Sequence, residues 1–167
     1  VAQFNGDSGA QVTAARLSRS PVTIALDQND SSVWVADSSG AISHVAVGGA
    51  VIGTPAHSDR SATSIAWGEG SLWAANGAAK GLVRVSLDTS GSRAAYPAGQ
   101  RPVAVTLDQG VWIAHTNGHV TRFDPRSAHL RVNADIAVAP ELDAIAAEDP
   151  GPFVWAISKS KRAVYRV

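Results

Sequence analysis

The spacing of tryptophan is the feature that most limits how this chain can fold. Four tryptophans recur at steps of 39, 39 and 43 residues: Trp34, Trp73, Trp112 and Trp155. Upstream of each lies an apolar run, and the centres of these runs recur at steps of 41, 40 and 40: Ile24, Ile65, Val105 and Ile145. Self-similarity at a fixed period of about 40 residues indicates a repeat protein, in which each repeat is one unit that buries its apolar face against its neighbours.

Turn residues divide each repeat into four short strands. In the third repeat, apolar runs at 103–107, 111–114 and 119–123 are separated by turns at 108–110 and at Asn117-Gly118, a strong hairpin signal. The sequence therefore predicts an all-β fold, a β-propeller of four-stranded blades with either four blades or an arc of a larger ring. A β-sandwich is the main rival, but it does not require this self-similarity. We expect the tryptophans to fill the space between blades.

The two ends of the chain fall at the same point of the repeat. We expect a single β-propeller domain over 1–167, with repeats near 11–47, 50–88, 92–125 and 128–167 and with 1–9 as the end of a preceding repeat. The last repeat then lacks its outer strand. Three interpretations stay open: the segment 11–17 supplies that strand and closes a four-bladed ring, the chain covers part of a larger ring, or two copies associate. Because an open arc exposes edge strands and a blade face, a homodimer through incomplete blades is one expected partner.

Charge and composition exclude some classes of partner. The 14 basic and 14 acidic residues cancel, so we expect no nucleic-acid binding. No run of eighteen apolar residues is present, so we expect no membrane insertion by this chain. The absence of cysteine excludes disulfides and thiolate metal sites.

Several segments resemble a known family of bacterial propellers. The segments 32–42, 70–76 and 110–115 read SVWVADSSGAI, GSLWAAN and GVWIAH, and 121–125 reads TRFDP. These motifs resemble those of the YVTN and NHL-like bacterial β-propellers, and the resemblance covers essentially the whole chain. It implies an extracytoplasmic recognition domain, the sensor or scaffold part of a bacterial receptor or envelope protein. Streptogramin lyases and gluconolactonase-like hydrolases have a similar repeat, but no catalytic or metal-binding motif of theirs is matched here.

Polar residues at equivalent positions suggest a ligand-binding rim on one face. A polar residue stands three positions after each tryptophan: Asp37, Asn76, His115 and Ser158. Arginines precede the first strands of three repeats: Arg19, Arg60 and Arg101. Together these residues predict a polar pocket, in which arginine would offer bidentate contacts to a carboxylate or phosphate. The alternative is that the short polar side chains form local turn hydrogen bonds and the arginines are solvated.

The function that the sequence favours is non-enzymatic recognition of a small molecule, glycan or protein, and we expect no catalytic residues, no metal and no cofactor. The alternative is a lyase or hydrolase in which His115, His119 or His57 acts with Asp37 on one face. Two of these histidines, His115 and His119, flank a single turn. Two ligands do not make a zinc site, because zinc generally needs three or four.

Overall fold

The computed structural model describes residues 1–58, 61–86, 93–98, 100–126, 132–148 and 151–167. In this part of the chain every regular element is a β-strand, and the strands form antiparallel sheets. None of the described segments forms a helix that is long and apolar enough to cross a membrane. The predicted all-β class and the arrangement of blades are confirmed.

Four sheets make up the blades, and each is a meander of consecutive strands. Blade 1 contains β3 (Pro21–Leu26), β4 (Val33–Asp37), β5 (Ala41–Val45) and β6 (Val51–His57). Blade 2 contains β7 (Ser64–Gly68), β8 (Ser71–Asn76), β9 (Gly81–Ser86) and β10 (Arg93–Pro97). Blade 3 contains β11 (Pro102–Leu107), β12 (Val111–His115), β13 (His119–Phe123) and β14 (Val132–Ala137). Blade 4 contains β15 (Ala144–Ala147), β16 (Val154–Ser158) and β17 (Ala163–Arg166).

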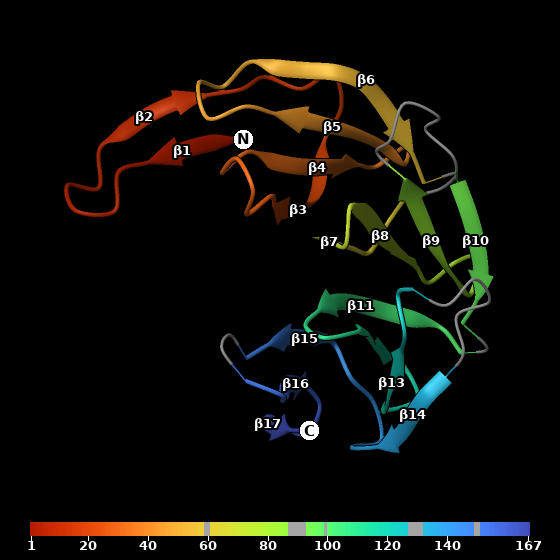
Figure 1. The fold of residues 1–167 in the computed structure, drawn as a ribbon. Helices are drawn as coiled ribbons and strands as arrows, with labels where there is room; N and C mark the ends of the chain where they lie inside the picture. The colour runs from red at the N-terminus through yellow and green to blue at the C-terminus, as the bar shows by residue number, and fades with distance from the viewer. Residues whose placement is uncertain (59–60, 87–92, 99, 127–131, 149–150) are drawn as a thin grey trace.

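The blades follow one another along an arc, with the first strand of each blade on the inside (Figure 1). Successive inner strands β3, β7, β11 and β15 contact one another. Side chains join them where no backbone ladder does: Ser64 exchanges hydrogen bonds with the backbone of Val105, and the Thr106 hydroxyl accepts one from the Ala147 amide. The concave side of the arc is therefore a continuous wall of four strands.

Turn chemistry sets where strands reverse. The turn between the second and third strands has one residue with positive φ in every blade: Gly40, Lys80, Gly118 and Arg162. At Gly118 the backbone is also crowded, because a Cβ atom there would lie 1.4 Å from the Ala139 carbonyl oxygen. Only glycine satisfies both the left-handed conformation and this close approach. The Asn-Gly turn predicted at this position is confirmed.

Apolar clusters between blades form the core. Each internal interface places the second-strand tryptophan of one blade against the next blade: Trp34 against blade 2, Trp73 against blade 3 and Trp112 against blade 4. These three side chains are between 0% and 8% exposed, as the sequence predicts. Trp155 is 42% exposed, because none of the described blades packs against that face of blade 4.

The N-terminal hairpin does not close the ring. The strand β2 (Gln11–Ala14) pairs with β1 (Ala2–Phe4), and the two form a separate sheet instead of completing blade 4. The hairpin is held locally, since the Asn5 side chain accepts hydrogen bonds from the amides of Asp7 and Ser8. It packs on blade 1, where Ala15 joins a cluster of buried residues with Val35 and Val45. Of the three interpretations left open by the sequence, closure through the segment 11–17 is therefore not observed.

Candidate ligand-binding site

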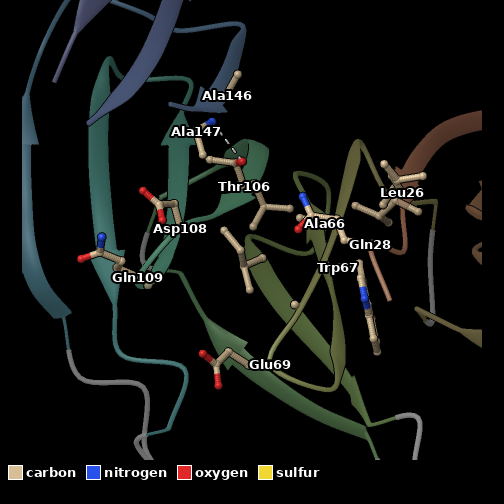
Figure 2. A pocket seen from close by; sticks show the side chains of 16 residues that line it. Leu26, Gln28, Ala66, Trp67, Glu69, Thr106, Asp108, Gln109, Ala146 and Ala147 are labelled. Carbon is tan, nitrogen blue, oxygen red and sulfur yellow. Dashed lines mark hydrogen bonds between the residues drawn. The ribbon is translucent and has the colours of Figure 1, made fainter. Parts of the chain in front are cut away.

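A cleft of about 590 Å³ opens on the concave wall, where the inner strands end and the first turns begin. Its lining comes from all four inner strands and from the turns of blades 1 to 3 (Figure 2). The apolar part includes Leu26, Trp67 and Leu107. Gly68 lets the inner strands approach closely here, since a Cβ atom on it would lie 2.7 Å from the Leu107 Cδ2 atom.

The polar part of the cleft carries carboxylates and amides. Asp108 and Glu69 supply the carboxylates, and Gln28 and Gln109 supply the amides. Among the described residues that line it there is no lysine, arginine or histidine. Asp108 is half-buried, whereas Glu69 is exposed and binds Arg126 at 3.2 Å. The cleft therefore combines apolar surface with the half-buried carboxylate of Asp108 and with a second carboxylate, that of Glu69, which Arg126 already pairs.

Each blade places an arginine or, in blade 1, an imidazole over its tryptophan beside the first turn. The residue opposite the tryptophan on the third strand is His44, Arg84, Arg122 or Arg166. His44 stacks on Trp34 with the ring centroids 4.0 Å apart, and the guanidinium carbons of the arginines lie 5.3 to 5.9 Å from the tryptophan ring centroids. Such pairs are attractive because the face of an indole ring is electron-rich.

These third-strand side chains also hold the first turns in place. Arg122 donates to the Gln109 carbonyl, Arg166 donates twice to Glu148, and His44 contacts the Ser32 hydroxyl. These pairs were not predicted from the sequence. The arginine or histidine that stands ten or eleven positions after each tryptophan is a pattern that could have indicated them. They set the shape of the turns that border the cleft in blades 1 and 3.

The predicted rim lies at the opposite end of the strands from this cleft. The four polar side chains that follow the tryptophans are buried, and each has a hydrogen-bond partner within six residues of itself. Asp37 accepts hydrogen bonds from the Ser39 and Ala41 amides, and Asn76 accepts one from the Ala79 amide. Ser158 accepts a hydrogen bond from the Lys161 amide.

The charge of Asp37 is stabilised despite its burial. Burial alone would raise its pKa, but the hydrogen bonds from Ser39 and Ala41 and the charge of Arg19 outweigh that effect and lower the pKa. Arg19 and Arg101 are exposed, and Arg60 lies outside the described residues. The structure thus places the short polar side chains in turns and two of the predicted arginines at the surface.

His115 is fully buried. Its Nε2 atom lies 2.7 Å from the Thr121 hydroxyl, and burial lowers its pKa from 6.5 to about 4, against the opposing charge of Asp135. His119 lies on the same blade, with its Nδ1 atom 2.8 Å from an oxygen of Asp135. His115 is therefore neutral at pH 7, and His119 is the histidine that a carboxylate orients. His57 is exposed, and its neighbour Asp59 lies outside the described residues.

One group of side chains in the described segments could hold a metal ion. Asp27, Asp30 and His44 offer ligand atoms that all lie within 4.8 Å of one another at the first turn of blade 1. Asp27 is oriented by hydrogen bonds from the Trp34 indole and the Asn29 amide. The donor set of two carboxylates and one imidazole is compatible with a divalent transition metal. From the sequence we expected no metal site, and these three residues form no recognisable ligand motif in it.

Comparison with known proteins supports the fold and nothing finer. No protein-family model matches the chain, and no curated protein matches it. Among solved structures, it is similar to the computationally designed Ika4 protein, with 13% identity and a TM-score of 0.69 over 93% of this chain and 94% of the other. It is also similar to hydrazine synthase from Kuenenia stuttgartiensis, with 14% identity, a TM-score of 0.72 and coverage of 89% and 45%.

A third similarity is to a chain of a nidogen/laminin complex, with 16% identity, a TM-score of 0.77 and coverage of 99% of this chain and 66% of the other. The chain thus spans between 45% and 66% of the length of these last two structures. Taken with its four consecutive blades, this similarity defines the chain as a β-propeller domain.

Proposed function

We propose that this chain is a non-enzymatic recognition domain that binds its ligand in the cleft of the concave wall. The observation that carries the proposal is the half-buried Asp108 carboxylate, which lines the same cleft as Trp67, and the described lining of that cleft has no basic side chain. A cavity of this size, mostly preformed and with a few polar groups, is typical of a binding site. Its function would be that of a sensor or scaffold.

The chemistry of the lining favours a ligand with a positively charged group. The ligand predicted from sequence was a small molecule, a glycan or a protein, and a lysine side chain on a peptide satisfies the cleft best. Its ammonium group would bind the Asp108 carboxylate, and its methylene chain would cover Trp67 and Leu107. A neutral glycan would satisfy the amides and Trp67 but would leave the Asp108 carboxylate without a counter-charge.

An NMR titration tests this proposal with defined probes. Acetylated and amidated tetralysine is expected to shift the Trp67 indole signal at low salt, whereas tetraglutamate and maltotetraose are not. Asp108→Asn is expected to weaken tetralysine binding at least about fivefold, because it removes a half-buried charge partner. Asp7→Asn, an acid in the N-terminal hairpin loop, is the matched control. Equal weakening by both variants, or no shift with tetralysine, would refute the proposal.

The predicted rim stays a second candidate site, on the strength of its exposed arginines. Arg101→Ala would abolish binding of an anionic ligand without changing the melting temperature. The enzymatic alternative, a streptogramin-lyase-like or gluconolactonase-like activity, would rest on the His119 and Asp135 pair as an oriented general base. Neither has a cleft as defined as the one beside Trp67.

The proposed location is extracytoplasmic, in a bacterial receptor or envelope protein. This rests on the resemblance of the repeat motifs to YVTN and NHL-like propellers.

A further inference from the structure

Blade 4 ends in an exposed apolar face. Trp155 and Ile157 alternate with buried residues along β16, and Val164, opposite Ile157 on β17, lies on the same face. All three are between 36% and 62% exposed. In blades 1 to 3 the equivalent face is covered by the next blade. In blade 4 it lies at one end of the arc (Figure 1).

The three internal interfaces show what such a face binds. In each, the tryptophan lies in a cluster with three apolar residues of the next blade: one from the first strand, one from the second strand, and one from the third strand or directly after it. These residues are Ile65, Leu72 and Val85 for Trp34; Val105, Val111 and Phe123 for Trp73; and Ile145, Val154 and Val167 for Trp112. The surface complementary to Trp155 is therefore defined by residue type and by position in the blade.

Blade 1 carries that complementary surface, and it is partly open. The equivalent residues of blade 1 are Ile24, Val33 and Val45, by the same strand register. All three line an apolar groove of about 210 Å³ between blade 1 and the N-terminal hairpin, together with Leu26. Ile24 and Leu26 are 52% and 56% exposed. The groove occupies the position at which a preceding blade would insert its tryptophan.

We propose that a second copy of this chain occupies the groove, with its Trp155 inserted against Ile24 and Val33. The contact continues an interface that the chain already makes three times. Because the two faces differ, the association is head-to-tail, and two arcs that each offer both faces can form a closed two-copy ring. The association goes beyond the proposed ligand cleft, since none of these contacts requires a bound ligand.

The N-terminal hairpin takes part in the contact. Both β1 and β17 correspond to the third strand of a blade, so they compete for one position when blade 4 docks. The incoming β17 has no strand at its outer edge among the described residues, and β2 corresponds to a fourth strand. Docking therefore releases β1 and pairs β17 with β2, as β5 pairs with β6, which gives blade 4 its full complement of four strands.

Light scattering after size-exclusion chromatography tests the proposal on the full chain. The wild-type protein is expected to have twice the chain mass at high concentration and to dissociate on dilution. Ile24→Asp in the groove and Ile157→Asp on the blade 4 face are each expected to weaken association at least about 100-fold, since each places a charge in the centre of an apolar interface. Val132→Asp on β14, with a similarly exposed side chain, is the matched control and should leave the mass unchanged.

Mixing the two weakened variants tests the head-to-tail arrangement. The Ile24→Asp copy keeps an intact blade 4 face and the Ile157→Asp copy keeps an intact groove, so the mixture should form a heterodimer through one interface. A wild-type chain that stays monomeric, an unchanged mass for both variants, or a mixture with no heterodimer would overturn the proposal. Circular dichroism melting of each variant shows whether it is folded, and both sites are exposed enough to tolerate the change.

Two truncations test the role of the hairpin. Removing residues 1–9 deletes β1 and keeps β2, and it is expected to strengthen association about tenfold or more because the competing strand is gone. Removing residues 1–17 also deletes the proposed fourth strand and is expected to weaken it. The same effect from both truncations would overturn the exchange of β1 for β17.

Discussion

Blades 2 and 3 and the terminal blades 1 and 4 are built from the same repeat, but their side chains have different surroundings. Trp73 in blade 2 is fully buried, and its equivalent Trp155 in blade 4 is 42% exposed. On the opposite side, Ile65 of blade 2 is buried while its equivalent Ile24 in blade 1 is 52% exposed. The comparison shows that in a repeat fold the neighbouring blade, not the repeat itself, decides whether a side chain belongs to the core.

The sharpest test of this comparison removes the equivalent tryptophans in turn. Trp73→Ala is expected to lower the free energy of unfolding by about 3 to 5 kcal/mol, because it leaves a cavity between two blades. Trp155→Ala should cost less than about 1.5 kcal/mol when measured in an Ile24→Asp background, where the chain does not self-associate. Urea denaturation measures both. Equal losses of unfolding free energy would show that burial between blades does not determine how much the repeated tryptophan stabilises the fold.

A second test compares two glycines with positive φ. Gly118→Ala in blade 3 is expected to cost about 3 kcal/mol or more, because its Cβ atom would collide with the Ala139 carbonyl oxygen. Gly9→Ala in the N-terminal hairpin should cost only about 1 kcal/mol, the price of the left-handed conformation, since no atom lies within 4 Å of the added carbon. Thermal unfolding of the two variants gives the difference. A mild effect of Gly118→Ala would mean that the turn and β14 can move apart.

The third and smallest effect concerns pH and compares two equivalent turn residues, His115 in blade 3 and Asp37 in blade 1. The pKa of His115 is lowered in the folded state from 6.5 to about 4, so the unfolded chain binds more protons between these values. Its contribution to stability is therefore present above pH 6.5 and declines as the pH falls to 4, by about 2 to 3 kcal/mol at most.

Urea titrations at several pH values measure this decline. His115→Asn, which introduces the residue found at this position in blade 2, is expected to flatten the pH dependence between 6.5 and 4. Asp37→Asn is expected to leave that window unchanged, because the pKa of Asp37 is lowered from 3.8 and its stabilising charge is lost only at more acidic pH. An unchanged slope in His115→Asn would show that another group titrates there.

Much of the fold could be predicted from sequence, because it depends on local signals. The Asn117-Gly118 turn was predicted from the residue types alone, as were the strands around Val105 and Trp112. The repeat made each prediction firmer, since the same pattern recurred in other blades. Pairing of the N-terminal segment could not be predicted in this way, because β1 and β17 match the same strand of the repeat and the sequence does not choose between them.

The candidate site could be predicted less well. The rim residues were selected because they are polar and equivalent, and the same two properties describe turn formers such as Asp37 and Asn76. The cleft at the other end of the strands includes Trp67, which falls outside the tryptophan repeat, and Asp108, which reads as a turn former. Trp67 and Asp108 are marked as candidate site residues only because they line the same cleft, and no sequence pattern shows that they do.

The sequence by itself determined the length of the repeat, the four strands of a blade and the turns that join them, because these depend on apolar alternation and on backbone preferences within a few residues. The tertiary structure decided which blade faces are covered, that β2 pairs with β1, and where carboxylates and Trp67 meet in a cleft. The covered faces and the cleft depend on contacts between residues about forty or more positions apart, whose free energy depends on how the blades pack along the arc. The pairing of β2 with β1 is local, but whether β2 pairs with β1 or with a distant third strand depends on the same packing.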